Sequence, residues 1–309
     1  MKIIKSEDNY IFEKSNVIAL GNFDGLHIAH RKLIETAVSI ARKNNLLSLV
    51  YVFDIHPMTI VGNTKQRLIT NLEQKLELIS GLGVDIIYIQ KFDYEFSKMQ
   101  PEHFITDILK KRLSCAYAVS GYDYKFGYKA EGDTDTIKNI GSKHDIKVKI
   151  LERIDYLGQP VSASRIRELL EIGDIQYVNN LLGREYQIRG TVEKGKLIGS
   201  KIGYPTANII LKDEMQIPAF GVYQTVTTVD GIGYDSITNI GNNPTVNKED
   251  IDKITCETHI IDKFGLKLYG KKIYIDFIKM IRKEQKYPDI EALKKAIARD
   301  ILLVKSYYK

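Results

Sequence analysis

Cysteine is scarce in this chain and tryptophan is absent. The only cysteines, Cys115 and Cys256, lie far apart without metal-ligand spacing, which argues against a disulfide scaffold or a cysteine-based metal site. Long apolar runs are also missing, because no stretch approaches the roughly 20 residues that a membrane-spanning helix needs. Residues 1–16 lack the apolar core of a signal peptide. We therefore expect a cytoplasmic protein without a membrane partner, in which both cysteines are packing residues.

Charge of one sign is not concentrated in any segment. The 309 residues carry 45 Lys and Arg against 39 Asp and Glu, a net charge of +6 that is scattered along the chain. A nucleic-acid-binding module would cluster basic and aromatic side chains on one face, so we expect no nucleic-acid partner. A mildly basic surface would equally attract the phosphates of nucleotides. The length and the 44% hydrophobic content fit two globular domains.

Short apolar runs alternate with helical patterns in the first half of the chain. Five runs have the character of strands that are apolar on both faces: 17–21, 47–53, 84–89, 115–121 and 146–151. Between them, Thr70 and Glu73 predict a capping box, and Pro101 suits the first turn of another helix. Such strands, alternating with helices, predict a parallel sheet covered on both sides, which is a doubly wound, Rossmann-like α/β domain.

The pattern changes after Gly183. Two predicted helices, 163–172 and 175–182, each end at a glycine suited to the left-handed conformation that terminates helices. The chain beyond them consists mostly of predicted short strands, with a hairpin signal at Asp230-Gly231 and one clear helix at 290–304. Many short strands and one terminal helix predict a small β-barrel. We therefore expect two domains, residues 1–183 and residues 184–309.

The first candidate site is the segment Gly21-Asn22-Phe23-Asp24-Gly25-Leu26-His27-Ile28-Ala29-His30. It joins the first predicted strand to the first helix, and ligands of doubly wound sheets bind at the carboxyl ends of strands. A helix N-terminus also presents free N–H groups to anions. His27 and His30 are therefore candidates for stabilising charge on the phosphates of ATP. The alternative is that one histidine caps the helix and the other packs.

A second segment of the same half, Ser162-Ala163-Ser164-Arg165-Ile166-Arg167, begins another predicted helix. Its hydroxyls, backbone N–H groups and a guanidinium are suited to a phosphate. The alternative is that a serine is only an N-cap and that the arginines form a solvated face.

These segments resemble the HxGH nucleotidyltransferase superfamily, and more narrowly the N-terminal half of prokaryotic bifunctional FAD synthetases. The likeness includes Phe53-Asp54-Ile55-His56-Pro57 and Gly121-Tyr122-Asp123-Tyr124-Lys125-Phe126-Gly127, while Ala29 replaces the usual glycine between the histidines. It implies transfer of AMP from ATP to FMN, with His27 and His30 at the ATP phosphates. The implied nucleotide site further includes Asn22, Phe23, Asp24, Asp123, Ser164 and Arg165. The implied flavin neighbours are Phe53, His56 and Pro57.

The second candidate site lies in a glycine-rich stretch of the second half. No Gly-x-x-x-x-Gly-Lys-Ser/Thr loop is present, so a kinase here is not of the P-loop kind. Instead, Gly195, Gly199 and Gly203 precede Tyr204-Pro205-Thr206-Ala207-Asn208. Glycines let backbone N–H groups approach phosphates, and the oxygens of Thr206 and Asn208 suit Mg²⁺ held mostly by ATP. The alternative is that the glycines serve hairpins and the polar residues lie in an ordinary strand.

This half is similar to the riboflavin kinase domain of the same bifunctional enzymes. The likeness covers segments that occur in family order: 203–208, 221–223, 239–245, 257–260, 268–270 and 281–284. It implies a Mg-ATP site made by Gly195, Gly203, Pro205, Thr206 and Asn208, with Thr206 and Asn208 as metal ligands. It also implies that Glu257 is the general base for the terminal ribityl hydroxyl of riboflavin, a group that phosphoryl transfer needs near the attacking oxygen. Arg282 would hold the flavin or a phosphate, the alternative being a surface arginine.

Both resemblances together cover almost the whole chain and predict one enzyme with two activities. Riboflavin and ATP would give FMN and ADP; FMN and a second ATP would give FAD and pyrophosphate, with Mg²⁺ in each step. One alternative is that a single domain is active in cells, with Ala29 marking the first as the weaker. Another is a regulatory protein that only binds flavin or nucleotide, which would not require His27, His30, Thr206, Asn208 and Glu257. The sequence carries no signal for an oligomeric state.

Overall fold

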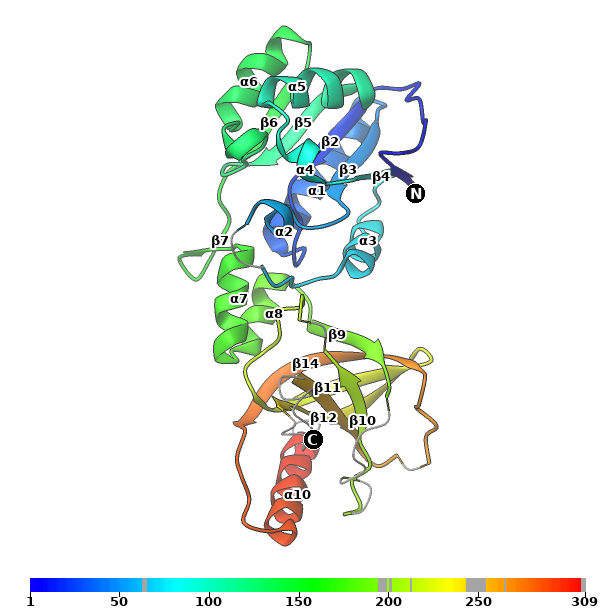
Figure 1. The fold of residues 1–309 in the computed structure, drawn as a ribbon, viewed down its shortest axis with the longest axis vertical. Helices are drawn as coiled ribbons and strands as arrows, with labels where there is room; N and C mark the ends of the chain where they lie inside the picture. The colour runs from blue at the N-terminus through cyan, green and yellow to red at the C-terminus, as the bar shows by residue number, and fades with distance from the viewer. Residues whose placement is uncertain are drawn as a thin grey trace. The chain divides into compact units, whose positions relative to one another are not determined.

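The structure is a computed structural model that describes residues 1–62, 66–193, 199, 202–211, 213–242, 254–263 and 265–306. The chain divides into two compact units, Met1–Arg165 and Ile166–Lys309 (Figure 1). Residues 166–183, which we expected to close the first domain, thus group with the second unit by their contacts. A functional boundary after Gly183 stays a prediction. Among the described residues, no helix is both long and apolar enough to cross a membrane.

The first unit is built on a six-stranded parallel sheet, which confirms the predicted fold class. Its strands, in spatial order, are β1 (Lys2–Lys5), β4 (Ile86–Gln90), β3 (Leu47–Phe53), β2 (Asn16–Leu20), β5 (Cys115–Gly121) and β6 (Lys147–Leu151). Strands β3 and β4 extend from one side of β2, and β5 and β6 extend from the other. The order therefore reverses between β2 and β5, where doubly wound sheets bind their ligands.

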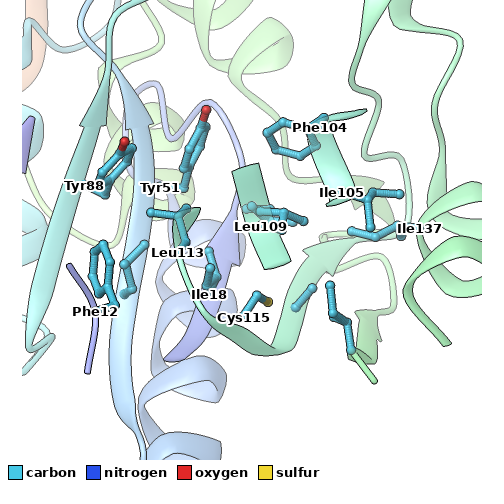
Figure 2. Packing of buried hydrophobic residues seen from close by; sticks show 14 of the residues in the cluster. Phe12, Ile18, Tyr51, Tyr88, Phe104, Ile105, Leu109, Leu113, Cys115 and Ile137 are labelled. Carbon is cyan, nitrogen blue, oxygen red and sulfur yellow. The ribbon is translucent and has the colours of Figure 1, made fainter. Parts of the chain in front are cut away.

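Helices cover both faces of this sheet. On one face lie α1 (Ile28–Lys43) and α3 (Leu72–Ser80), and on the other the π-helix η1 (Phe104–Arg112) and α6 (Thr134–Lys143). Strand β2 supplies both cores, because Val17 and Ala19 face α1 whereas Ile18 and Leu20 face η1. Figure 2 shows part of the core on the face that η1 covers. The shorter elements are α2 (Met58–Val61), α4 (Tyr94–Ser97), α5 (Pro101–His103), η2 (Tyr128–Ala130), β7 (Asp155–Tyr156) and β8 (Gln159–Pro160).

The capping box of α3 lies one residue later than we predicted. Asn71, not Thr70, is the N-cap: its side chain accepts from Gln74 N at 2.8 Å, and the Gln74 side chain accepts from Asn71 N at 3.2 Å. The Thr70 hydroxyl is used elsewhere, since it accepts from Gly25 N at 3.0 Å. This hydrogen bond to the loop after β2 explains why Thr70 is not the cap, because a capping side chain must be free to turn back onto its own helix.

The second unit is a six-stranded antiparallel sheet that is curled into a near-barrel. Its strands, in spatial order, are β10 (Ala207–Ile210), β13 (Ile254–Ile260), β12 (Ile232–Asn242), β11 (Gly221–Val229), β14 (Lys272–Lys283) and β9 (Tyr186–Thr191). A backbone bridge from Glu193 to Asn208 joins the two edges. Asp230 and Gly231 have φ of 50° and 80° and form the predicted hairpin turn between β11 and β12.

Three helices complete the second unit, the first of which begins three residues before its boundary. They are α7 (Ala163–Ile172), α8 (Ile175–Leu182) and α10 (Ile290–Ser306), close to the predicted bounds. Gly183 ends α8 with φ of 66°, as its left-handed role requires. Helix α10 packs Val304 and Ile297 against Val222 and Ile237 on the outer face of the barrel.

The inner face of the barrel holds a cluster of hydroxyl groups that fixes which residues point outward. The cluster consists of Thr225, Thr227, Ser236, Thr238 and Thr258, all at most 1% exposed and linked by contacts of 2.8–3.1 Å. Because each hydroxyl is paired with another, their burial carries little cost. Side chains alternate along a strand, so the residues beside Thr238 and Thr258 face outward, toward α10.

Candidate active sites

The first site begins at the reversal of strand order. Asn22 follows β2 and Asp123 follows β5, and these two strands are paired. The carboxyl ends of parallel neighbours meet at one edge of a sheet, which brings the two predicted nucleotide residues to the same edge. His27 and His30 then lie at the start of α1.

The two histidine rings are stacked, with centroids 3.6 Å apart and planes 15° apart. His27 is the N-cap of α1, and its Nδ1 accepts from His30 N at 3.3 Å. One alternative we considered, a capping histidine, therefore describes part of what His27 does. Nδ1 of His30 is buried and has no hydrogen-bond partner among the described residues. An unpartnered buried nitrogen leaves His30 with hydrogen-bonding capacity for a ligand.

A buried lysine that we did not predict lies near His30. Lys75 of α3 is 7% exposed, and its Nζ donates to the carbonyl oxygen of Asn22 at 2.9 Å. Burial lowers the pKa of Lys75, and nearby Asp24 opposes that shift. The lysine therefore holds the loop after β2 against α3. Its only sequence signal is that Lys75 shares the apolar helical face of Leu72 and Ile79.

Two residues of the predicted nucleotide set are buried in the loop itself. The Asp24 carboxylate is 2% exposed and accepts from the backbone N–H groups of Ile69 and Thr70 at 3.1 and 3.2 Å. Phe23 is fully buried, with its ring edge-on to His30 at 5.2 Å. Both side chains thus hold the loop and the histidine in place, and direct contact of either with ATP stays a prediction.

The predicted flavin neighbours line one cavity of about 870 Å³. Phe53, His56 and Pro57 form part of its wall, and Asn22 links the cavity to the histidine loop. Eight further aromatic side chains line it: Tyr51, Phe92, Tyr94, Phe96, Phe104, Tyr124, Phe126 and Tyr128. A large cavity lined by many aromatic rings, with polar groups among them, suits a flat, conjugated ligand.

The segment at the start of α7 is organised by local hydrogen bonds. Ser162 Oγ accepts from Arg165 N at 3.3 Å, which is the capping role we considered as the alternative. The Arg165 guanidinium donates to Gln159 Oε1 at 3.2 Å, and Ser164 is exposed. Participation of Ser164 and Arg165 in the nucleotide site stays a prediction.

The stability of the first unit should depend on the protonation of His30. Burial lowers the pKa of His30 well below its ordinary value of about 6.5, and the charges of His27 and Lys75 lower it further. In acid the unfolded chain therefore binds the proton more readily, so the free energy of unfolding should fall as the pH drops below about 6.5. Thermal unfolding at pH 7.5 and 5.5 checks this. The loss on acidification should be smaller in His30→Gln, and an equal loss in both proteins would contradict the assignment.

The second site is a row of residues that crosses five strands on the outer face of the barrel. Cross-strand neighbours pair Asn208 with Glu257, Glu257 with Asn239, Asn239 with Val222, and Val222 with Arg282. Paired residues project from the same face of a sheet. Glu257 and Arg282 both line a cavity of about 530 Å³ that residues of α10 also line. The structure therefore brings together candidates that came from separate motifs.

The predicted Mg-ATP residues lie at one edge of this row. Thr206 lines the same cavity, and Asn208 Nδ2 donates to the Thr206 carbonyl oxygen at 3.5 Å. Gly203 has φ of +91°, a conformation that other residues rarely adopt. The Pro205 carbonyl contacts His259 Nδ1 at 2.8 Å, and Gly195 lies outside the described residues.

The donor set of this edge fits a magnesium ion that ATP largely holds. The hydroxyl of Thr206 and the amide oxygen of Asn208 are hard donors of the kind that Mg²⁺ accepts. Within the described ranges, no group of three or more His, Cys, Asp or Glu side chains could bind a metal alone. Phosphate oxygens and water would therefore have to supply most of the coordination.

Arg282 is held by an aspartate that the motifs did not reveal. Its guanidinium donates to Asp300 of α10 at 2.9–3.2 Å, and Asp300 is 4% exposed. The alternative interpretation, that Arg282 is a surface arginine, is therefore wrong, because Arg282 lies in a largely buried ion pair at the cavity. Its contact with flavin or phosphate stays a prediction.

Removing one partner of the Arg282–Asp300 pair should destabilise the protein more than removing one partner of an exposed ion pair that the same helix makes. Asp300→Asn should lower the free energy of unfolding by about 3 kcal/mol, because it leaves a largely buried guanidinium without its counter-charge. Asp262→Asn is the matched control: Asp262 pairs with Lys305 of α10 at 2.6 Å but is 69% exposed, so about 0.5 kcal/mol is expected. Denaturant titration of the two variants measures the difference. Equal losses would contradict this account.

Comparisons with known proteins cover both halves of the chain. A family model described as FAD synthetase matches residues 11–165, and one described as riboflavin kinase matches residues 182–308. The bifunctional riboflavin kinase/FMN adenylyltransferase of Bacillus subtilis is 35% identical over 93% of this chain and 91% of that protein. The protein of the same name from Buchnera aphidicola subsp. Schizaphis graminum is 33% identical over 100% of this chain and 99% of that protein.

Both units are also matched by a solved structure. It is the crystal structure of a macrolide-efflux protein from Streptococcus pneumoniae, with a TM-score of 0.88 and 26% identity over 98% of each chain. The shared fold thus extends through both units, while the sequence relatives and the two family models identify the kind of protein. The chain belongs to the family of bifunctional riboflavin kinase/FMN adenylyltransferases.

Proposed function

We propose that this chain makes FMN from riboflavin at the barrel site and FAD from FMN at the site of the first unit, using one ATP in each reaction. The observation that carries the proposal is the row from Asn208 through Glu257 to Arg282. In this row a carboxylate lies between an arginine and the edge that we propose to hold Mg²⁺, which supports phosphoryl transfer to a hydroxyl.

In the kinase reaction, the terminal ribityl hydroxyl of riboflavin attacks the γ-phosphorus of ATP, and ADP leaves. Glu257 accepts the proton of that hydroxyl as the new P–O bond forms. Thr206 and Asn208 would hold Mg²⁺, which neutralises charge on the phosphates. Gly203 and Pro205 set the course of the backbone just before β10, beside Thr206 and Asn208. Arg282 binds the flavin or a phosphate at the other end of the row.

In the adenylyltransferase reaction, a phosphate oxygen of FMN attacks the α-phosphorus of ATP, and pyrophosphate leaves. The nucleophile comes from FMN itself, so the protein has to position the reactants and stabilise charge. His27 and His30 stabilise the phosphates at the N-terminus of α1, with Asn22 and Asp123 beside them at the same edge. Phe53, His56 and Pro57 bind the flavin in the aromatic cavity, and Ser164 and Arg165 contribute to the nucleotide site.

The two reactions release different products from ATP, and this tests the proposal. With riboflavin, ATP and Mg²⁺, the first reaction should yield one ADP for each FMN formed. With FMN in place of riboflavin, pyrophosphate should appear in equal amount to FAD, and ADP should not. A protein that used one site for both steps would lose both products on substitution of either Glu257 or His30. We also propose a cytoplasmic location, where both reactions find their ATP.

A further inference from the structure

A tyrosine hydroxyl in the aromatic cavity has no partner in the protein. Tyr51 lies on β3, is 2% exposed and lines the cavity of about 870 Å³ in the first unit. Its hydroxyl is fully buried and makes no hydrogen bond among the residues that the structure describes. Figure 2 shows it beside Tyr88, with both hydroxyls pointing toward the same end of the sheet. Such an atom is uncommon in a folded protein, because a buried hydroxyl normally finds a partner.

The ring of Tyr51 is fixed by its neighbours. It stacks on Tyr88 at 5.8 Å and meets Phe53 and Phe104 edge-on at 5.5 and 5.7 Å. These contacts restrict the ring, so the hydroxyl cannot readily turn to a partner elsewhere in the core. Phenylalanine would preserve every ring contact, which makes the hydroxyl group itself the feature that packing does not explain.

We propose that the Tyr51 hydroxyl donates a hydrogen bond to a ring carbonyl of the flavin bound in this cavity, and thereby selects the ligand. The inference rests on the proposed function, in which FMN occupies the cavity. Phe53 and Phe104, which pack against Tyr51, are apolar and line the same cavity, so the hydroxyl is a polar group set among rings and can orient a flat ligand.

The chemistry of the phenol determines the direction of the hydrogen bond. Burial raises the pKa of Tyr51 well above its ordinary value, and neighbouring Tyr124 and Tyr88 raise it further. The group therefore stays protonated at neutral pH and can donate. The isoalloxazine ring of a flavin presents carbonyl oxygens as acceptors along its polar edge. A ligand without such an acceptor would leave the hydroxyl unpaired and would bind more weakly.

Tyr51→Phe, with Tyr88→Phe as a matched control, tests the proposal. Tyr88 is 1% exposed and stacks on Tyr51, but it is not part of the cavity wall. With FMN and ATP as substrates, Tyr51→Phe should raise the KM for FMN by about 3- to 10-fold, the loss of one neutral hydrogen bond. It should leave FMN formation from riboflavin unchanged and the ligand-free protein at least as stable as the wild type. The infrared carbonyl stretch of bound FMN should move to higher wavenumber. Tyr88→Phe should change neither the KM nor the stretch.

An unchanged KM and an unchanged carbonyl stretch in Tyr51→Phe would overturn the proposal, provided that the wild type forms FAD. A loss of stability in the ligand-free Tyr51→Phe protein would also overturn it, because the hydroxyl would then have a partner within the fold. If the wild type formed FMN but no FAD and bound no FMN in the first unit, the proposed function of that unit would fail instead.

Discussion

Glu257→Gln is expected to lower the rate of FMN formation from riboflavin by about 10²- to 10⁴-fold, the usual contribution of a general base. The substitution preserves the shape of the side chain beside Asn208 and Asn239 but removes the proton acceptor. FAD formation from supplied FMN should be unchanged, because that reaction takes place in the other unit. Initial rates of both reactions, followed by separating the flavins chromatographically, measure the two effects in one protein.

Glu291→Gln is the control for this variant. Glu291 is a carboxylate of α10 that pairs with Lys294 at the surface, where it is 73% exposed. We expect both activities to survive that change. If Glu257→Gln retained FMN formation, or lost FAD formation as well while remaining folded, the assignment of Glu257 as the base of a separate kinase site would be wrong.

His30→Ala should have the opposite effect, reducing FAD formation by about 10²- to 10³-fold and leaving FMN formation intact. The reason is the position of the imidazole at the N-terminus of α1, where the structure leaves Nδ1 without a hydrogen-bond partner among the described residues. Groups of this kind contribute most where charge develops in the transition state, here on the α-phosphate and pyrophosphate. The kinetic readout is kcat/KM for ATP with saturating FMN.

The packing of His30 calls for a second variant, because its ring lies edge-on to buried Phe23 and removal leaves a cavity. His30→Gln fills more of the space and should show a similar loss of FAD formation. His144→Ala, at the C-terminus of α6, is the control and should retain both activities. Near-normal FAD formation in both His30 variants would refute its role at the phosphates.

The apolar pattern of the sequence was sufficient to predict most of the fold. Apolar runs located five of the six strands of the first unit, and four of these, β2 to β5, form the middle of the sheet, which is buried on both faces. Gly183 marked the end of α8 through a conformation that favours glycine. Strand β1 was missed because only one of its four residues, Ile4, is buried, which gives no pattern.

The candidate sites were only partly predictable, for a different reason. Motifs identify residues that lie close together in the chain, and these include Phe23 and Asp24, whose side chains are buried in the loop. Lys75, Tyr51 and Asp300 act through partners or cavity walls that are distant in sequence. The bond from Lys75 to Asn22, for example, spans 53 residues. No local spacing reveals such a contact, because it depends on how the helices and strands pack.

A chromatographic time course of the wild-type protein with riboflavin, ATP and Mg²⁺ tests the central claim most directly. Two working sites in one chain predict that FMN accumulates first and that FAD follows at its expense. FMN alone would contradict the role of the first unit. The whole account would be contradicted if folded protein made neither FMN from riboflavin nor FAD from supplied FMN, and a protein that only binds flavin would then be the better description.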